Sequence, residues 1–398
     1  MSLTAAPMLA GLLFAINDAE DRPDRLAATL PFAGTTLIEY QARLLVAAGV
    51  SQIVVAVARL TPDLLGAISR IGRRGVAVDA VRSAAEAAEK LHPLARVLVL
   101  ADGLVTTEKV VGPLAGEGGD TLLVVGEEEA GSGFEQIGGK LAWAGAARLT
   151  VPRIRDVARM PRDYDMQSAL LRAGVQAGAT HLLLPSTAAS EGHGLEHRAS
   201  ALEARGRIVL QAAMSGGRSW FDCWVVAPIG RLALPTLVTR RVTTAAPLLA
   251  GALLGAGAMA VISADLYAAG LAAALGSTIV LALGGTLAEL RDEAALSRAQ
   301  VAGSVLVPAL AMLLLAWRLG HWSREGTAAV AAFSLALFGT LVERAAAGAA
   351  RPLWWSSPGA YLLIVLAATL AGAPVAGLLA AELYAAATLY DAVRRRRD

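Results

Sequence analysis

The feature that most constrains this chain is a change of hydrophobic pattern near residue 240. Before that point, short apolar runs alternate with charged stretches of helical period. After Arg240-Arg241 the sequence becomes a series of long apolar spans with few ionisable residues inside them. A helix needs roughly 20 mostly apolar residues to cross a bilayer. The pattern therefore predicts a soluble domain joined to a polytopic membrane domain.

The composition agrees with two domains of this kind. The chain has 398 residues, of which 56% are hydrophobic, a share too high for an ordinary soluble protein. Its net charge is only +2, so no nucleic-acid partner is expected. The single cysteine, Cys223, fits a reducing compartment. Leu9–Ile16 lacks a preceding basic region and is interpreted as a buried strand and not as a signal peptide, which predicts a cytoplasmic soluble domain.

We expect an all-α domain of six membrane-spanning helices. The last two only barely reach the required length, and Gly372-Ala373-Pro374 between them indicates a tight hairpin. The expected spans are 244–263, 266–288, 300–317, 326–343, 357–373 and 374–392.

The arginines that flank these spans predict their orientation. Cytoplasmic loops carry an excess of Lys and Arg. With both termini cytoplasmic, nearly all flanking arginines fall on the inside, and Arg318 and Arg324 are the exceptions. The arginines on the inside are 240, 241, 291, 298, 344, 351 and 394–397. The sequence thus predicts an integral protein of a bacterial-type inner membrane, with its N-terminal domain and C-terminus in the cytoplasm.

The segment before the first span has an amphipathic pattern. Trp220, Phe221, Trp224 and Val225 alternate with polar residues ahead of Pro228. This favours an interfacial helix on the cytoplasmic leaflet, and the alternative is a linker helix packed on the soluble domain. The predicted organisation is a soluble domain over 1–190, a linker with the interfacial helix over 191–240, and a membrane domain over 241–398.

The soluble half predicts an α/β, Rossmann-like domain with a mostly parallel sheet covered on both faces. Expected helices cover Leu37–Ala48, Pro62–Arg73 and Ser83–Lys90. Ligands of such sheets bind beyond the carboxyl ends of the strands, so Asn17–Leu30 and Asp102 are the positions of interest. Expected strands are Gly11–Ile16, Gln52–Val57, Gly75–Asp79, Arg96–Ala101, Thr121–Val125, Phe134–Ile137 and Leu141–Arg148.

Three motifs of this half are similar to those of a known family. The run Leu30–Tyr40, with the strand Ile53–Val57 after it, resembles the opening of the sugar-phosphate nucleotidyltransferases, whose fold is a GT-A-like Rossmann variant. Ala101-Asp102-Gly103 resembles their metal-binding aspartate, and Asp163–Ser168 resembles the segment that supplies a second carboxylate. The resemblance implies Asp102 and Asp165 as ligands of Mg²⁺, which neutralises charge during nucleotidyl transfer. The alternative for Asp102 is a capping or turn aspartate.

Two departures from the family concern the phosphates of a nucleotide. The family's glycine-rich loop is replaced by 17–25, which has no glycine and four carboxylates that would repel phosphates. Phe32 stands where the family has a lysine. Arg22 and Arg25 are the candidate nucleotide-binding residues that could compensate.

The two halves together resemble the bifunctional inositol-phosphate cytidylyltransferase fused to a CDP-alcohol phosphotransferase domain. This implies CTP or a CDP-alcohol as nucleotide, a membrane lipid as partner, a homodimer through the membrane domain, and a role in phospholipid or sphingolipid headgroup metabolism. The phosphotransferase signature is D-G-x2-A-R-x8-G-x3-D-x3-D. Gly285 and Ala288 match it, but Gly284, Ala302 and Leu306 stand in place of its aspartates and Glu289 in place of its arginine.

Two further sets of residues are candidate sites. Glu382 lies inside the last span, where a carboxylate is costly enough to suggest cation or headgroup binding, and Glu289 lies at a span end. Contact with water or with a neighbouring helix is the alternative for both. His193 and His197 have the spacing of a metal pair on one helix face, although a solvated loop is favoured.

Two hypotheses follow for function. One is a surviving Mg²⁺-dependent nucleotidyl transfer in the N-terminal domain, with Asp102 and Asp165 on the metal and Arg22 or Arg25 on the phosphates. The other is a pseudoenzyme that binds a lipid or a nucleotide as a scaffold or regulatory partner.

Overall fold

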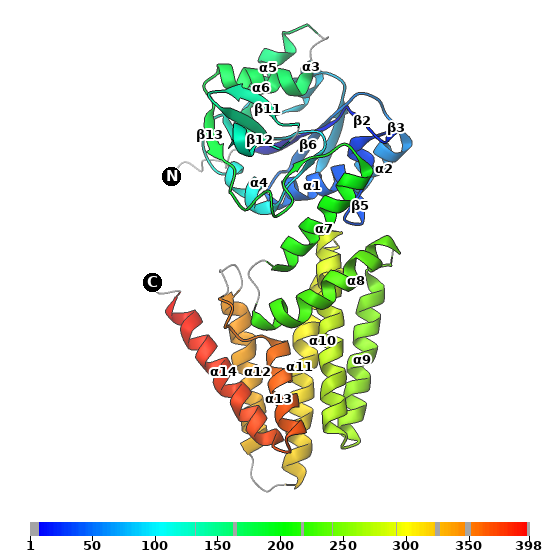
Figure 1. Cartoon of the computed structure of the whole chain (residues 1–398), viewed down its shortest axis with the longest axis vertical. Coiled ribbons are helices and arrows are strands. Elements are labelled where there is room, and N and C mark those ends of the chain that lie inside the picture. Colours follow the sequence, from blue (N-terminus) through cyan, green and yellow to red (C-terminus); the bar gives the residue numbers. More distant parts are fainter. Residues whose placement is uncertain are drawn as a thin grey trace. The chain divides into compact units, whose positions relative to one another are not determined.

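The computed structural model of the chain describes residues 8–131, 133–161, 165–215, 219–240, 242–291, 293–322, 327–346 and 352–395. It divides into two compact units, Met1–Ala212 and Ala213–Asp398. Figure 1 shows that the first unit combines strands with helices and that the second is helical. The two units are described separately.

An eight-stranded mixed sheet forms the centre of the first unit. Its strand order is β13-β10-β12-β8-β1-β6-β7, with β11 paired to β12. Strands β7, β6, β1 and β8 are parallel, whereas β12 runs antiparallel to both β8 and β10. The strands are β1 (Leu9–Ala15), β6 (Gln52–Val57), β7 (Ala77–Val81), β8 (Arg96–Leu100), β10 (Thr121–Gly126), β11 (Glu135–Gly138), β12 (Leu141–Thr150) and β13 (Thr180–Leu183).

The α/β class is confirmed, and the sequence missed only the edge strand β13 among the strands of this sheet. The helices of the first unit pack against the sheet, and Gly11 of β1 permits this closely. A Cβ atom at Gly11 would lie 2.5 Å from Leu45 Cδ1 of α1. The helices are α1 (Leu37–Ala47), α2 (Pro62–Gly72), α3 (Ala84–Lys90), α4 (Glu108–Leu114), α5 (Val151–Ala158), α6 (Met166–Gln176) and α7 (Ala199–Ser215).

Side-chain caps explain where several of these helices begin. Thr36 and Glu39 form a reciprocal capping box at α1, and Thr61 caps α2 by accepting the N–H of Leu64. Such caps satisfy backbone donors that the first turn of a helix leaves unpaired. The three helices predicted from the sequence are confirmed to within one residue at each end.

The second unit is a bundle of helices. A π-helical turn at Asp222–Val226 leads into α8 (Ala227–Thr239), and the remaining helices follow the apolar spans. They are α9 (Ala245–Ser263), α10 (Tyr267–Leu290), α11 (Ala294–Trp322), α12 (Thr327–Ala346), α13 (Pro358–Leu370) and α14 (Pro374–Arg394).

The prediction of six spans is wrong in number. Within the described residues, four helices, α9 to α12, are long and apolar enough to cross a membrane. Helix α13 has 13 residues, or about 20 Å at the α-helical rise, against a hydrocarbon core of about 30 Å. Helix α14 is longer, but it carries Glu382, Asp391 and Arg394. The predicted span 357–373 also counted residues 371–373, which lie beyond the end of α13.

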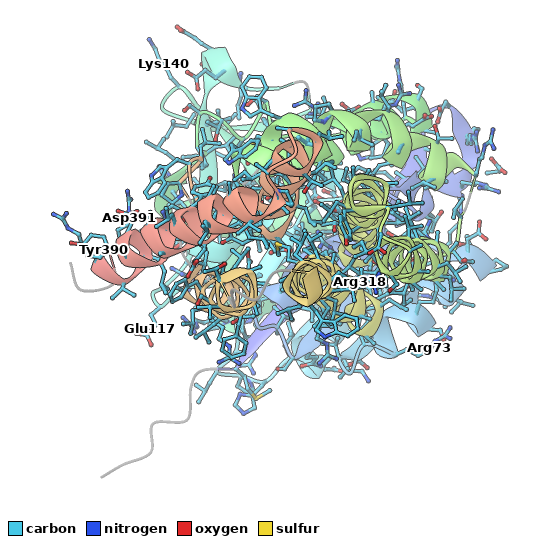
Figure 2. The ribbon with its side chains drawn as sticks, turned by 90° about the horizontal axis from the view of Figure 1, so that it is seen from below. Arg73, Glu117, Lys140, Arg318, Tyr390 and Asp391 are labelled. Atoms are coloured by element: carbon cyan, nitrogen blue, oxygen red, sulfur yellow. The ribbon has the colours of Figure 1, made fainter. Side chains whose placement is uncertain are left out.

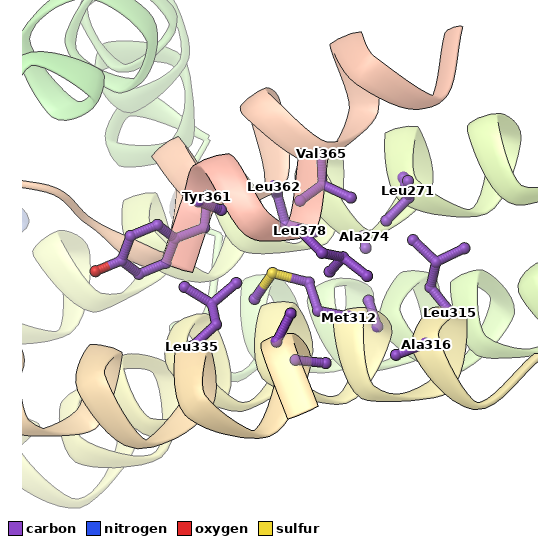
Figure 3. Packing of buried hydrophobic residues seen from close by; sticks show 14 of the residues in the cluster. Leu271, Ala274, Met312, Leu315, Ala316, Leu335, Tyr361, Leu362, Val365 and Leu378 are labelled. Carbon is purple, nitrogen blue, oxygen red and sulfur yellow. The ribbon is translucent and has the colours of Figure 1, made fainter. Parts of the chain in front are cut away.

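All six of these helices nevertheless share one hydrophobic core. Figure 3 shows Leu271 of α10, Met312 of α11 and Leu335 of α12 converging with residues of α13 and α14. Leu362 and Leu378 are fully buried in this cluster. Helices α13 and α14 are therefore integral parts of the bundle, although they do not qualify as spans.

Glycines let α9, α10 and α11 approach closely. Leu281 of α10 lies between Gly251 of α9 and Gly303 of α11. A Cβ atom added at Gly251 would lie 2.5 Å from Leu281 Cγ, and one added at Gly303 would lie 3.1 Å from Leu281 Cδ1. At the next layer, a Cβ atom at Gly255 would lie 3.0 Å from Val307 Cγ2. Small residues at helix contacts are a common way to pack helices in membranes.

The π-helical turn and α8 have apolar side chains on two faces. Phe221, Val226 and Leu234 pack on α10 and on Ala360 of α13. On the other face, Trp224 is 77% exposed and Leu232 is 81% exposed. An interfacial helix has such an exposed apolar face, and its position on a leaflet stays a prediction.

Several charged residues form hydrogen bonds or ion pairs at the ends of the bundle. Tyr390 and Asp391 lie near the end of α14 (Figure 2), where Asp391 accepts hydrogen bonds from Trp355 Nε1 at 2.9 Å and Arg395 Nε at 2.7 Å. Arg318, an exception to the positive-inside pattern, pairs with Asp265 at 2.6 Å. The other exception, Arg324, lies outside the described residues.

We predict that Gly251→Ala destabilises the second unit by about 1–3 kcal/mol, because its methyl group would collide with Leu281 in an already filled core. Gly257→Ala in the same helix is the matched control, since nothing lies within 4 Å of its Cβ position. Unfolding in mixed detergent micelles measures both variants. Equal stabilities would contradict the packing described for α9 and α10.

Candidate functional site

The carboxyl ends of two neighbouring parallel strands bring together the first candidate residues. Strand β1 pairs with β8, and Asp102 lies two residues after the end of β8. Asp102 Oδ2 accepts the N–H groups of Ile16 at 2.9 Å and Asn17 at 2.7 Å, at the end of β1. The side chain is buried, with 1% exposed. One oxygen of Asp102 therefore stabilises the backbone at the end of β1.

The loop that carries Asp102 is held from two helices. Gln41 Nε2 of α1 donates to the carbonyl oxygens of Ala101 at 3.0 Å and Leu104 at 2.9 Å, and Gln167 Oε1 of α6 accepts the N–H of Asp102 at 2.9 Å. The Tyr40 hydroxyl donates to the carbonyl of Thr106 at 2.6 Å. These hydrogen bonds consequently fix the position of the loop at the carboxyl end of β8.

The second oxygen of Asp102 is buried and unsatisfied. Oδ1 has no hydrogen-bond partner among the described residues, and the same holds for the buried Nε2 of His197. Burial raises the pKa of Asp102, while the N–H groups of Asn17 and Ile16 and the nearby His197 act in the opposite direction. Buried polar atoms without a partner are rare in native proteins and call for an explanation.

Residues 192–198 lie across this loop. The N–H of Glu196 donates to the carbonyl of Gly103 at 2.9 Å, and strand β14 (Gly194–Leu195) pairs antiparallel with β9 (Leu104–Val105). Gly103 has φ +76°, and a Cβ atom on it would lie 2.7 Å from His197 Nε2. The His197 imidazole therefore packs directly on the turn that holds Asp102.

The acidic loop after β1 forms a hairpin whose carboxylates bind groups of the same unit. Its strands are β2 (Asp18–Ala19) and β3 (Arg22–Leu26). Asp18 pairs with Arg59 at 2.7 Å, and Glu20 pairs with Arg198. Asp21 accepts the N–H of Ala199 at 3.0 Å, at the first residue of α7. Three of the four carboxylates are thus already paired or capping.

The two predicted phosphate-binding arginines lie on this hairpin. Arg22 and Arg25 are both exposed on β3. Neither side chain forms a hydrogen bond or ion pair with another residue in the described part of the chain. Their guanidinium groups are therefore available to an external anion.

The second predicted metal ligand has a structural contact. Asp165 is exposed and caps α6 by accepting the N–H of Ser168 at 2.9 Å. Asp163, from the same motif, lies outside the described residues. In the described ranges no group of three or more His, Cys, Asp or Glu residues could hold a metal ion. Because Asp102 Oδ1 also lies beneath the 192–198 segment, these residues do not fit a Mg²⁺ ion as arranged.

Phe32, which stands where the resembled family has a lysine, is a core residue. Its ring packs edge-on against Tyr40, with 4.6 Å between centroids. On its other side it contacts α7, where a Cβ atom at Gly206 would lie 3.5 Å from Phe32 Cε2. The position consequently supports α7 from within the hydrophobic core.

The two histidines do not form a metal pair on one helix face. His193 is buried, and its Nδ1 and Nε2 lie 2.9 Å from Thr106 Oγ1 and 3.0 Å from the carbonyl oxygen of Ala144. A carbonyl only accepts, so Nε2 carries the proton and Nδ1 accepts from Thr106. Strand β14 separates His193 from His197, so the solvated loop expected for this segment is also wrong for His193.

Around Gly284 the second unit is closely packed. A Cβ atom at Gly284 would lie 2.8 Å from Gln300 Nε2 and 2.8 Å from Pro247 Cβ. Gln300 is fully buried and its Nε2 donates to the carbonyl of Thr244 at 2.9 Å. Ala302 and Leu306, the other two positions counted for aspartates, are exposed on α11. The three positions therefore do not converge on a common site.

The predicted membrane carboxylates differ in their surroundings. Glu289 is exposed near the end of α10. Glu382 is half-buried on α14 and forms no hydrogen bond or ion pair with a residue that the structure describes. The sequence missed Gln41, Gln167 and Gln300, although a glutamine inside the apolar span of α11 was a visible signal.

Comparison with known proteins adds little to this geometry. No family model matches the chain. No curated protein matches it either. Among solved structures, 143 chains match. One is the inositol-1-phosphate CTP transferase from T. maritima, with 16% sequence identity, a TM-score of 0.34, and coverage of 45% of this chain and 86% of that chain. A similarity this weak assigns neither a fold nor a function.

We predict that His193 makes the first unit sensitive to acid. Burial lowers the pKa of His193 to about 4, against 6.5 for an ordinary histidine. Between these values the unfolded chain binds a proton that the folded chain does not, so stability falls as the pH falls. Linkage gives a loss of about 2 kcal/mol from pH 7 to pH 5.

Urea denaturation of the detergent-solubilised chain at both pH values tests this, with His193→Gln expected to remove most of the loss. His181→Gln is the control because His181 is exposed on β13. A loss of the same size in His193→Gln would show that another group is responsible.

Proposed function

We propose that this chain is a membrane-anchored pseudoenzyme of the nucleotidyltransferase and CDP-alcohol phosphotransferase lineage, which binds a lipid or a nucleotide as a scaffold or regulatory partner. The observation that carries the proposal is the closed packing at Gly284, where Gln300 and Pro247 fill the space an aspartate would need. Four helices long and apolar enough to span a membrane support the anchoring.

In the membrane half, packing argues against metal-assisted transfer. Two-metal chemistry needs carboxylates that converge on ions about 4 Å apart. The side chain of Leu281 fills the contact between Gly251 and Gly303, and Gln300 fills the contact at Gly284. An apolar side chain and an amide thus occupy the positions where α10 faces α9 and α11.

In the soluble half, the hydrogen-bonding pattern also argues against catalysis. Asp18, Glu20 and Asp21 are paired or capping, and Asp165 caps α6. Phe32 offers no charge to a phosphate. Each of these positions serves the fold, which is the pattern expected where selection for catalysis has been replaced by selection for stability.

One observation favours a second candidate function, a Mg²⁺-dependent nucleotidyl transfer. Asp102 Oδ1 remains unbonded, and Arg22 and Arg25 are exposed on the hairpin that follows β1, the strand whose end Asp102 contacts. In this alternative Asp102 and Asp165 would hold the metal and the arginines would bind the phosphates. The 192–198 segment would first have to move, because it lies over the Asp102 loop.

The partners follow from the same proposal. We infer CTP or a CDP-alcohol as the nucleotide, a phospholipid or sphingolipid as the membrane partner, and a homodimer through the membrane half. The soluble unit and the C-terminus would face the cytoplasm of a cell with a bacterial-type inner membrane. Glu382, unpaired within the described residues, and Glu289 are the membrane residues that we assign to headgroup or cation contact.

Turnover of labelled CTP separates the two candidates. We expect the full chain in lipid nanodiscs, with Mg²⁺ and a panel of alcohol phosphates, to form no CDP-alcohol above the level of its Asp102→Asn variant. Asp102→Asn is the reference because, among the described residues, Asp102 is the buried carboxylate with an oxygen that forms no hydrogen bond. Product formed by the natural sequence and lost in Asp102→Asn would establish the transferase and exclude the pseudoenzyme.

We predict that Gly284→Asp destabilises the bundle and creates no metal site, because its Cβ atom alone would lie 2.8 Å from Gln300 Nε2. Overpacking of this kind costs about 1–3 kcal/mol, and a buried unpaired carboxylate adds to it. Gly285→Ala is the neighbouring control, since its nearest contact would be 3.7 Å from Val301 Cγ2. Metal-dependent thermal stabilisation of Gly284→Asp would contradict the closed packing.

A further inference from the structure

We propose that the exposed face of the π-helical turn and α8 binds the headgroup boundary of an anionic bilayer, with Arg231 on lipid phosphates and with Trp224 and Leu232 in the apolar layer beneath them. The inference rests on the membrane anchoring in the proposed function, and it adds the class of lipid and the surface that contacts it. It does not depend on whether the first unit is a pseudoenzyme.

The π-helical turn and α8 have an apolar face that the bundle does not cover. Phe221, Val226 and Leu234 are buried against the bundle. On the opposite face, Leu232 is 81% exposed, more than any other large apolar side chain that the structure describes, and Trp224 is 77% exposed. In water these side chains forgo the free energy of burial, whereas the boundary of a bilayer accepts them.

Helix α8 lies at one end of the bundle. Its buried side packs on Leu283 and Leu287, in the last two turns of α10, and on Ala360, in the first turn of α13. Figure 1 shows α8 inclined to the long helices α9 and α10. Four helices of this bundle are long and apolar enough to cross a membrane, so the ends of the bundle lie near the headgroup layers. Helix α8 therefore has the position and the exposed face of an interfacial helix.

The charges along this part of the chain favour an anionic surface. Between Asp222 and Asp265 the sequence contains three arginines, at 231, 240 and 241, and no Asp, Glu or Lys. Asp222 itself accepts the N–H and the hydroxyl of Ser219, at 3.3 Å and 3.0 Å. A basic segment free of carboxylates is attracted to the phosphates of anionic lipids.

Arg231 lies on the same face as the exposed apolar side chains. It precedes Leu232 directly and follows Trp224 by about two helical turns. Arg231 is exposed, and the ion pairs in the described part of the second unit lie elsewhere, at Asp265 and Asp391. An arginine can lay its aliphatic part along an apolar surface and donate from its guanidinium to a phosphate. The face thus matches the chemistry of an anionic phospholipid.

A second segment extends the same surface. The N–H of Trp220 donates to the carbonyl of Leu353 at 2.7 Å. Its Nε1 donates at 2.8 Å to the hydroxyl of Tyr384, which donates at 2.6 Å to the carbonyl of Trp354. Leu353 and Trp354 are both exposed. These bonds hold two further apolar side chains next to the π-helical turn, and tryptophan is enriched at the level of the headgroups.

Quenching by brominated lipids tests the contact with the bilayer. In nanodiscs that contain the full chain, we expect bromines near the headgroup to quench Trp224 more strongly than bromines at the ends of the acyl chains, because the face lies at the boundary. Trp224→Phe should therefore lower the quenched fraction of the fluorescence. Trp143→Phe is the matched control, since Trp143 is 2% exposed in the core of the first unit.

The selectivity is tested by diluting brominated phosphatidylglycerol or brominated phosphatidylcholine into unbrominated phosphatidylcholine. The fluorescence that Trp224→Phe removes should report about fivefold enrichment of the anionic lipid, the factor expected for one basic residue near charged lipid. Arg231→Gln should abolish the enrichment, whereas Arg207→Gln, which removes an exposed arginine of α7, should not. About 1 M salt should also abolish it in the natural sequence, because the Debye length falls to about 3 Å.

The contact is refuted if no brominated lipid quenches the Trp224 fluorescence, a result that would assign the face to a protein partner or to water. The anionic selectivity is refuted if the two lipids quench equally, or if Arg231→Gln or high salt leaves the enrichment intact. The salt measurement uses the natural sequence, so poor folding of Arg231→Gln does not leave the selectivity untested. CTP turnover has no bearing on these outcomes, and loss of the lipid contact would leave the pseudoenzyme proposal as it stands.

Discussion

The first unit depends on the hydrogen bonds that Asp102 makes with the end of β1. Its Oδ2 atom accepts two consecutive N–H groups, from Ile16 and Asn17, just after the end of β1. A buried carboxylate is costly unless such donors stabilise it. Because β1 and β8 are adjacent, this single side chain fixes the start of the hairpin after β1. That hairpin in turn holds the first turn of α7.

Three side chains of the first unit share one structural effect. Glu20 and Asp21 bind Arg198 and cap α7, while Phe32 packs against Gly206 of the same helix. The hairpin after β1 and the aromatic side chain at position 32 thus both hold α7 in place.

The sequence was most informative where the pattern is local. Buried strands and capped helices were predicted closely, because periodicity and capping residues are read within one element. The exposed edge strand β13 was missed, since Thr180-His181-Leu182-Leu183 has no alternating buried face. The contact of Gln300 with Gly284 joins two helices, and the sequence pattern of neither helix indicates it. For the same reason, His197 could not be assigned to the Asp102 loop.

The contacts of Tyr384 have a consequence for the order in which the second unit is completed. Its hydroxyl accepts from Trp220 Nε1, a residue 164 positions earlier, and donates to the carbonyl of Trp354. The first turn of this unit thus gains its partner only when the last helix has left the ribosome. Until then, the aromatic side chains around Trp220 would need lipid or a chaperone to shield them during synthesis.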